Sequence, residues 1–278
     1  MKKILKILIP LAILGILWYQ FGDLIRAWFL PCREPIAYTL GIFDTKFGIS
    51  KSYFLDAVQE AEMIWEKPFE KELFVYKADS KADTLKINLV YDYRQQATSK
   101  LADIGIIVKD NRASYDSLKI KFTELKKDYE IELKNFNQDV QAFNKGDRNN
   151  QAEFNRLQEE QKNLKTKVEE INAMVVVLNR LVATLNLSVE TYNTVGATRG
   201  ESFEEGVYVQ EGLSREIDIY EFSSREKLVR VLAHELGHAL GLDHVNDSQA
   251  IMYELNQGNN KTLTEADLEA LKTRCGLK

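Results

Sequence analysis

The placement of the histidines constrains the fold of this chain more than any other feature. The chain contains three histidines, and all of them fall in the segment HELGHALGLDH, residues 234–244. Positions i and i+4 share one face of an α-helix, so His234 and His238 point the same way. Gly241 can adopt the left-handed conformation that ends a helix. The segment is therefore expected to form a helix, stop at Gly241 and turn back, which brings His244 towards the other two histidines.

The residues before this segment fit the same helix. Ser223 and Glu226 form a capping-box pattern, which makes Ser223 the expected N-cap. An apolar stripe at helical spacing follows, made of Leu228, Val231, Leu232 and Leu236. We expect the helix to run from about Ser224 to Leu240.

Three histidines at this spacing indicate a zinc site. The ring nitrogens of His234, His238 and His244 would supply three ligands and leave the fourth position open. Glu235 lies about 100° around the helix from His234, which suits a general base acting on a metal-bound water better than a further ligand. Zinc lowers the pKa of such a water to about 7. The alternative, an amphipathic helix whose histidines only pack or face solvent, explains neither Gly241 nor His244.

The extended pattern HExxHxxGxxH resembles that of the metzincin metallopeptidases. In that group a tight turn carries a methionine beneath the zinc, and Met252 occupies the corresponding place. The short link from His244 to Met252, with Tyr253 directly after, is similar to the matrixin branch. The resemblance implies a zinc-dependent endopeptidase with one catalytic Zn²⁺ and with Glu235 as its base.

The resemblance extends to the elements expected around the motif. Residues 35–40 resemble the opening matrixin strand, residues 50–65 the first helix, and residues 85–91 a central strand of a twisted, mostly parallel sheet. The edge strand that holds an extended substrate would contain Gly206, Val207, Tyr208 and Val209. No histidine is left for the second, structural zinc of animal matrixins, so that site is expected to be absent. Ca²⁺ is compatible with the resemblance, but its ligands cannot be assigned.

Between residues 95 and 193 the chain changes character. Proline is absent, glycine is rare, and Lys, Glu, Gln and Asn dominate. Apolar residues recur at alternating spacings of three and four from Phe154 to Tyr192, and more loosely from Tyr115 to Phe143. A turn-forming sequence, residues 144–150, separates the two halves. The pattern predicts an antiparallel coiled-coil hairpin with arms of about 60–70 Å, inserted between the third and fourth strands.

Three roles for this hairpin stay open: a solvated spacer, a contact between subunits, or a device that recruits or gates substrate. Its aromatic residues Phe122, Tyr129, Phe136 and Phe143 are seven positions apart, which favours packing in the seam over a ligand site. A partner protein or self-association through the coiled coil is therefore one expectation. The net charge of −5 argues against nucleic acid as a partner.

Residues 1–30 are expected to lie outside the globular fold. Lysines at positions 2, 3 and 6 precede an apolar run that reaches Phe21, about 18 residues when counted from Ile4 and near the lower limit for a bilayer span. The absence of a convincing small-residue cleavage site favours an uncleaved transmembrane helix with the N-terminus in the cytoplasm. The alternative is a cleaved signal peptide and a secreted protein. Either way, the catalytic domain is expected outside the cytoplasmic membrane.

The two cysteines, Cys32 and Cys275, lie near the two ends of the expected catalytic domain. A disulfide between them is plausible in an oxidising compartment, and free thiols are the alternative. A latency switch with Cys32 as a temporary zinc ligand is disfavoured, because the order Pro31-Cys32-Arg33 is the reverse of the usual Arg-Cys order.

The expected fold class is α+β. The segments are an anchor over 1–30, a first catalytic part over 31–94, the hairpin over 95–193 and a second catalytic part with the zinc motif over 194–278. Expected partners are a protein or peptide substrate and, through the N-terminal helix, the membrane. The alternatives to an endopeptidase are a non-proteolytic coiled-coil scaffold and a zinc hydrolase acting on cell-wall peptides.

Overall fold

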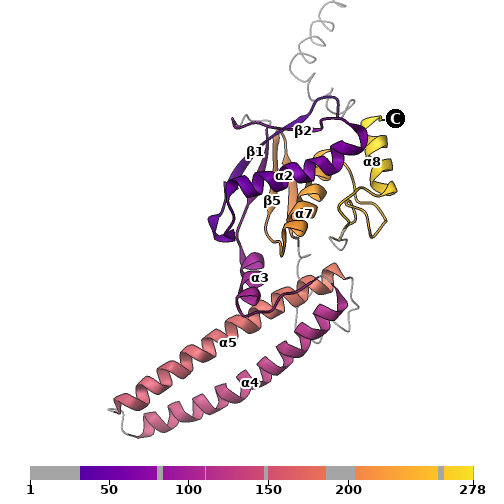
Figure 1. Ribbon diagram of the computed structural model, residues 1–278. Helices are drawn as coiled ribbons and strands as arrows, with labels where there is room; N and C mark the ends of the chain where they lie inside the picture. Colours follow the sequence, from indigo (N-terminus) through magenta and orange to yellow (C-terminus); the bar gives the residue numbers. More distant parts are fainter. Residues whose placement is uncertain are drawn as a thin grey trace, which may run out of the picture.

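The computed structural model describes residues 32–79, 84–109, 111–146, 150–185, 204–255 and 260–277. A sheet with helices packed on it forms one end of the molecule, and a long helical hairpin projects from it (Figure 1). The predicted membrane anchor, residues 1–30, lies outside the described residues. Within the described ranges, no helix is both long and apolar enough to cross a membrane.

The sheet has five strands in the order β2-β1-β3-β5-β4. Strands β1 (Ile36–Phe43), β2 (Phe74–Tyr76), β3 (Leu85–Leu89) and β5 (Ser214–Ile219) run parallel to one another. Strand β4 (Gly206–Glu211) runs antiparallel to β5 and forms an edge of the sheet. The expected mostly parallel sheet is thereby confirmed.

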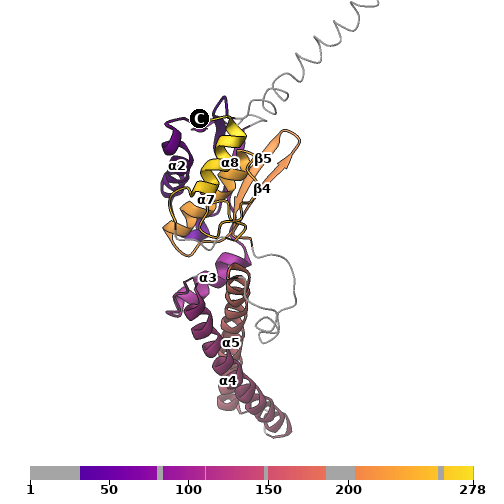
Figure 2. The ribbon, with the colours of Figure 1, turned by 90° about the vertical axis from the view of Figure 1, so that its right-hand side faces the viewer.

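Helices α2 (Lys51–Glu66) and α7 (Arg225–Ala239) pack against each other and share one core with the sheet (Figure 2). The indole nitrogen Nε1 of Trp65 in α2 donates a hydrogen bond to the carbonyl of Ala233 in α7 at 2.8 Å. The predicted N-cap of α7 is wrong by one residue. The N-cap is Ser224: its backbone is extended, and its hydroxyl accepts a hydrogen bond from the backbone N–H of Lys227.

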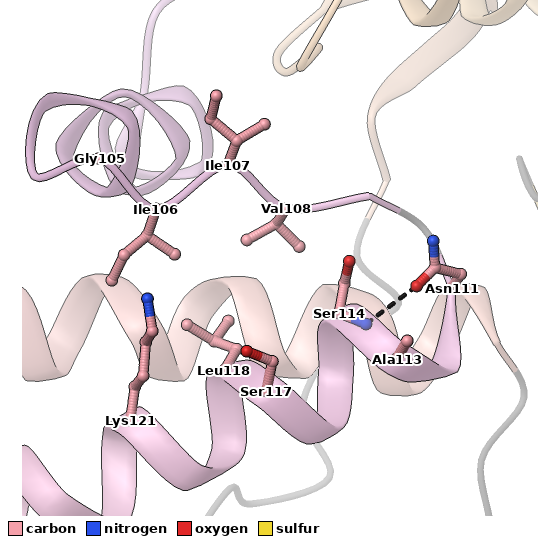
Figure 3. Close-up of a pocket in the computed structure, with 10 residues that line it drawn as sticks. All are labelled: Gly105, Ile106, Ile107, Val108, Asn111, Ala113, Ser114, Ser117, Leu118 and Lys121. Carbon is pink, nitrogen blue, oxygen red and sulfur yellow. Dashed lines mark hydrogen bonds between the residues drawn. The ribbon is translucent and has the colours of Figure 1, made fainter.

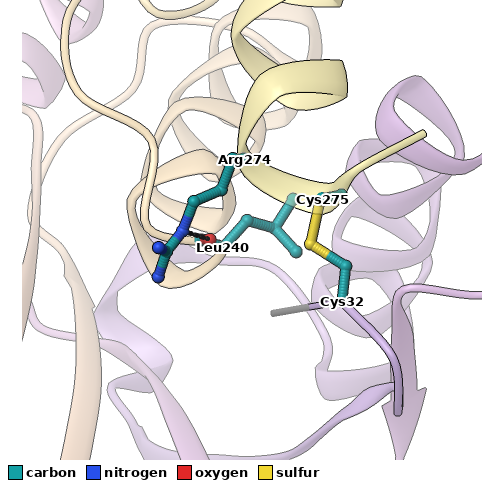
Figure 4. Close-up of a disulfide and its surroundings, with 4 residues drawn as sticks. All are labelled: Cys32, Leu240, Arg274 and Cys275. Carbon is teal, nitrogen blue, oxygen red and sulfur yellow. Dashed lines mark hydrogen bonds between the residues drawn. A yellow bond between two sulfur atoms is a disulfide. The ribbon is translucent and has the colours of Figure 1, made fainter. Parts of the chain in front are cut away.

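Cys32 and Cys275 join the segment before β1 to the end of helix α8 (Glu265–Cys275). Their sulfur atoms are bonded and their Cα atoms lie 5.3 Å apart (Figure 4). The bond links residues 243 positions apart in the sequence, so it closes a loop that contains the sheet, the hairpin and α7.

The hairpin consists of two antiparallel helices, α4 (Arg112–Lys145) and α5 (Gln151–Thr184). Each has 34 residues, which corresponds to about 51 Å at the rise of an α-helix. The first arm is shorter than predicted because the first part of the insertion forms a separate helix, α3 (Tyr93–Asp103), followed by an irregular segment. Helix α3 also begins two residues before the expected boundary at residue 95. The predicted continuation of the second arm to Tyr192 lies outside the described residues.

The base of the hairpin has an apolar core of its own. It is built from α3, the beginning of α4 and the end of α5, and its buried members are Ala97, Leu101, Tyr115, Leu118, Phe122, Ala173, Met174, Val177, Leu178, Leu181 and Val182. The predicted seam positions of α4, from Tyr115 to Phe143, are all buried or half-buried. Towards the tip the seam opens, and Phe154 is 42% exposed. The helical hairpin agrees with the heptad pattern, while supercoiling of the two helices stays a prediction.

A shallow hollow lies at the same base, between the irregular segment after α3 and the first turns of α4 (Figure 3). Ile106, Val108 and Leu118 line it together with small polar side chains and the charged Lys121. None of the predicted site residues lines this hollow. The predicted site residues lie instead on α7, in the chain after it and on β4.

Candidate metal centre

The three histidines converge on one point. His234 and His238 lie one turn apart on α7, and His244 comes from the loop that follows it. The Nε2 atom of His234 is 3.1 Å from Nε2 of His238 and 3.3 Å from Nε2 of His244. One nitrogen of each ring lies within 4.8 Å of the others, so the three side chains can hold a metal ion.

The hydrogen bonds of the other ring nitrogens decide which atoms face the metal. Nδ1 of His234 lies 2.7 Å from the carbonyl oxygen of Ile251, and Nδ1 of His238 lies 2.9 Å from that of Leu242. A carbonyl oxygen can only accept, so each Nδ1 carries the proton and each Nε2 presents a lone pair. Two lone pairs this close repel each other unless a cation lies between them. Nitrogen ligands of a tetrahedral zinc are separated by about 3.3 Å, so the donor set fits Zn²⁺.

Burial keeps these histidines in the form that binds a metal. It lowers the pKa of His234 to about 3, although the hydrogen bond to Ile251 opposes this shift. Burial also lowers the pKa of His238, against the opposing hydrogen bond to Leu242. Both rings are therefore neutral at neutral pH, which is the state required of a metal ligand.

Gly241 turns the chain after α7, as the sequence predicts. Its φ is +82°, in the left-handed region, and its N–H donates to the carbonyl of His238 at 2.9 Å. Arg274 of α8 covers the turn, with Nε donating to the carbonyl of Leu240 at 3.2 Å (Figure 4). A Cβ at position 241 would lie 2.7 Å from Nε of Arg274, so Arg274 would have to move, and the positive φ would strain any other residue. The turn that delivers His244 thus requires glycine.

Met252 packs against α7 at Gly237. It is fully buried, and a Cβ added at Gly237 would approach its Sδ to 2.2 Å and Trp65 to 2.9 Å. The methionine turn therefore fits beneath the helix because position 237 has no side chain. Met252 falls where the sequence placed it, whereas Gly237 was not singled out as a site residue.

Asp267 holds the turn beneath the histidines. Its two carboxylate oxygens accept hydrogen bonds from the backbone N–H groups of Ile251 and Met252, both at 2.9 Å. The carbonyl of the same Ile251 accepts the hydrogen bond from Nδ1 of His234. Asp267 therefore positions His234 indirectly, through the backbone of Ile251. The carboxylate also accepts from the N–H and hydroxyl of Thr264, the N-cap of α8. The spacing of Thr264 and Asp267, a capping-box pattern, was the available sequence signal for this residue.

Arg230 supports the same loop from within α7. Its guanidinium is 4% exposed and donates to the carbonyls of Ala250 at 2.6 Å and Asn260 at 2.9 Å. Sequence reasoning did not identify this residue, because its partners lie 20 and 30 positions away in irregular chain.

Glu235 lies between α7 and the edge strand β4. It is 4% exposed, and a Cβ at Gly206 would be 3.1 Å from its Cγ and 2.9 Å from Val231. Gly206 therefore lets β4 approach the helix closely. Burial raises the pKa of Glu235 to about 8; a hydrogen bond from the backbone of Tyr208 opposes the increase, and the charge of Glu204 adds to it. Burial therefore favours the protonated carboxyl at neutral pH, whereas a cation bound by the neighbouring histidines would favour the carboxylate.

The predicted substrate residues, Gly206 to Val209, lie on β4. One side of this strand pairs with β5, and the strand ends the sheet order, so its other side is an edge. Tyr208 links this edge to Glu235 through its backbone. The structure thus brings the predicted strand and the predicted base together.

A helix bearing HExxH, a third histidine beyond a glycine turn and a buried methionine turn together define a class, the metallopeptidases. The chain belongs to the matrixin family, which matches residues 36–274. The match begins at the first residue of β1 and ends within α8, so it encloses the sheet, the hairpin and the metal centre. Neither the curated proteins nor the solved structures contain a match to the chain.

Proposed function

We propose that this protein is a zinc-dependent endopeptidase that cleaves proteins or peptides outside the cytoplasmic membrane. One observation supports it above all others. The Nδ1 atoms of His234 and His238 are both used on backbone carbonyls, so their Nε2 lone pairs converge with His244 next to the buried carboxyl of Glu235. Membership of the matrixin family supports the same activity.

The chain's own residues divide the work of peptide hydrolysis. When bound by the three histidines, zinc supplies a Lewis acid that activates water and polarises the scissile carbonyl. Glu235 takes a proton from the attacking water and transfers it to the amine nitrogen as the C–N bond breaks. Its carboxyl is buried, and a cation held by the histidines would favour the ionised form that accepts a proton. Met252 takes no part in the proton transfer and supports α7 from below.

The edge of β4 is the proposed binding site for an extended substrate. Gly206, Val207, Tyr208 and Val209 offer main-chain groups to which a peptide adds as a further strand. The backbone link from Tyr208 to Glu235 supports this assignment, since a peptide on this edge passes the proposed base.

The proposed location rests on the N-terminal sequence and on the cysteines. A positively charged N-terminus followed by an apolar run is typical of an exported or anchored protein. The bond between Cys32 and Cys275 suits an oxidising compartment, in which disulfides persist. We therefore propose a single-pass membrane protein with an extracytoplasmic peptidase, or else its secreted form.

The decisive test compares the wild type with Glu235→Ala and His238→Ala on unfolded protein and, in parallel, on purified cell wall. We expect one zinc per chain in the wild type and in Glu235→Ala, and loss of zinc in His238→Ala. Glu235→Ala should lower kcat by about 10²–10⁴-fold. Activity in the metal-free protein would contradict the proposal. Cleavage of wall material alone would assign the cell-wall alternative, and an indifferent Glu235→Ala would support a scaffold.

A further inference from the structure

In the chain, the hairpin lies between β3 and β4, the strand that borders Glu235. Helix α3 follows β3 and lies between the sheet and the hairpin (Figure 1). The last residues before β4 are Glu204 and Glu205. Contacts made by these two residues therefore determine where β4 begins.

Arg94, in the first turn of α3, holds Glu204. Its Nη1 donates to the Glu204 carbonyl at 2.7 Å, while Nε and Nη2 donate to Asp92 at 2.9 and 2.6 Å. The guanidinium also stacks 3.5 Å from the centre of the Tyr220 ring. Asp92 follows β3 and Tyr220 follows β5, so one side chain joins the ends of two strands to the start of a third. Only 13% of the Arg94 side chain is exposed.

Glu205 is fixed by a second set of contacts from the same side. Its carbonyl accepts hydrogen bonds from the N–H groups of Tyr220 and Glu221 at 2.9 and 3.2 Å. The Glu221 carboxylate in turn accepts from Arg180 of α5 at 2.6 Å and from Thr98 of α3 at 2.8 Å. Arg180 and Glu221 are 1% and 0% exposed. Helices α3 and α5 of the hairpin base thus both contact Glu221, whose backbone N–H holds the start of β4.

A short, stiff stretch of strand connects this joint to the proposed base. Glu204 lies two residues before Gly206, where a Cβ would be 3.1 Å from Glu235, and four residues before Tyr208, whose backbone hydrogen-bonds Glu235. Gly206 and Tyr208 lie within four residues of Glu204 on a strand that pairs with β5 from its first residue, so a displacement of Glu204 acts close to Glu235. A misplacement of 1 Å at a reacting group can cost about 100-fold in rate.

We propose that Arg94 is a positioning residue that fixes the start of β4 against Glu235, which makes the base of the inserted hairpin a working part of the peptidase. Arg94 contacts neither the metal ligands nor the edge of β4; it acts through Glu204. The inference rests on the proposed peptidase function for its kinetic consequence, but the placement of β4 is measurable without any turnover.

The test compares Arg94→Ala and Arg94→Lys with Arg156→Ala as the matched control. Arg156 is also a multiply bonded arginine, but it lies near the exposed tip of α5, where its partners are Glu153, Asp139 and Glu160. The measurements are zinc per chain, thermal unfolding, kcat and KM on a peptide, and hydrogen exchange of the β4 amides. Zinc content and thermal unfolding detect general damage to the fold. The kinetic constants and the hydrogen exchange report on the position of β4.

Arg94→Ala should keep one zinc per chain but lose about 10- to 100-fold in kcat/KM, mainly through a lower kcat because the displacement reaches Glu235. Its β4 amides should exchange at least about 10-fold faster, with α2 unchanged. Arg94→Lys, which keeps one donor for Glu204, should recover part of both losses, and Arg156→Ala should match the wild type within about twofold.

Two outcomes would overturn the inference: wild-type kinetics and β4 exchange in Arg94→Ala, or a loss in that variant that follows zinc release and unfolding throughout the domain. The proposed function can fail separately. If the wild type binds zinc but cleaves no peptide, the peptidase proposal fails, and the β4 exchange of Arg94→Ala and Arg94→Lys still decides the role of Arg94.

Discussion

At the scale of single residues, Asp267 shows how a side chain distant from the metal shapes it. The two carboxylate oxygens of Asp267 accept hydrogen bonds from the N–H groups of Ile251 and Met252 in the methionine turn. The carbonyl of Ile251 in the same turn orients His234. Asp267→Asn replaces one oxygen with a donor, so one buried N–H loses its partner. We expect zinc affinity to fall about 10- to 100-fold, as measured by competition with a chelator. Glu265→Gln, an exposed change on the same helix, is the control. Wild-type zinc affinity in Asp267→Asn would show that the turn holds without the carboxylate.

Glu62 in α2 predicts a pH dependence of stability. Burial raises its pKa to about 7 from the usual 4.5; the neighbouring Tyr38 hydroxyl opposes the increase, and the carboxylates of Glu66 and Glu72 add to it. The raised pKa means that the folded state holds its proton more tightly. This stabilisation is complete below about pH 4.5 and is lost as the pH rises through about 7.

Glu62→Gln should therefore gain stability relative to the wild type between pH 5 and pH 8, by up to about 3 kcal/mol. Denaturant unfolding at the two pH values measures this, with the exposed α2 change Asp56→Asn as control. A difference between Glu62→Gln and wild type that is equal at both pH values would contradict the assigned pKa.

At the scale of elements, α7 and the hairpin arms were predictable because their signals are local. A cap, an apolar stripe and Gly241 define α7, and the error of one residue at its start reflects two adjacent serines that can both cap. Helix α3 was not predicted, because it is mostly polar and buries only Gln95, Ala97 and Leu101. The contacts of Asp267 and Arg94 with distant backbone depend on tertiary packing, which periodicity does not contain.

A disulfide joins the segment before β1 to the last helix of the catalytic domain. The bond between Cys32 and Cys275 secures α8, whose Arg274 covers the turn after α7. Replacing both cysteines with serine should lower the free energy of unfolding by about 2–5 kcal/mol. A reducing agent should lower the melting temperature of the wild type and leave the double variant unchanged. Two titratable thiols in the native, oxidised protein would refute the pairing.

At the scale of the whole molecule, two apolar cores meet at a polar joint. The first joins the sheet to α2 and α7, and the second lies at the hairpin base. Between them lies the buried pair of Arg180 and Glu221. Deleting residues 95–192 would remove Arg180 and Thr98, which bond the Glu221 carboxylate, and Gln95, which accepts a hydrogen bond from the Phe222 N–H. We therefore expect this deletion to destabilise the catalytic domain.

A shorter deletion separates the role of the hairpin tip from that of its base. Ion pairs across the hairpin, such as Lys167 with Glu132 and Arg156 with Asp139, give the register of the two arms. In that register, residues 128–169 can be replaced by a short glycine-containing turn while every buried residue of the second core is kept. The deletion also removes the ion pair between Lys100 of α3 and Glu169, which is partly exposed and contributes less than about 1 kcal/mol.

We expect the protein without residues 128–169 to fold, to bind one zinc and to cleave short peptides within about twofold of the wild type. A short peptide needs only β4 and the metal centre, whose supports all lie outside the deleted stretch. If the tip recruits substrate, cleavage of folded protein substrates should fall while peptide cleavage persists; if it is a spacer, both should persist. Loss of peptide cleavage together with intact zinc binding would mean that the tip itself supports the active site, which the contacts of Arg94 and Arg180 assign to the base.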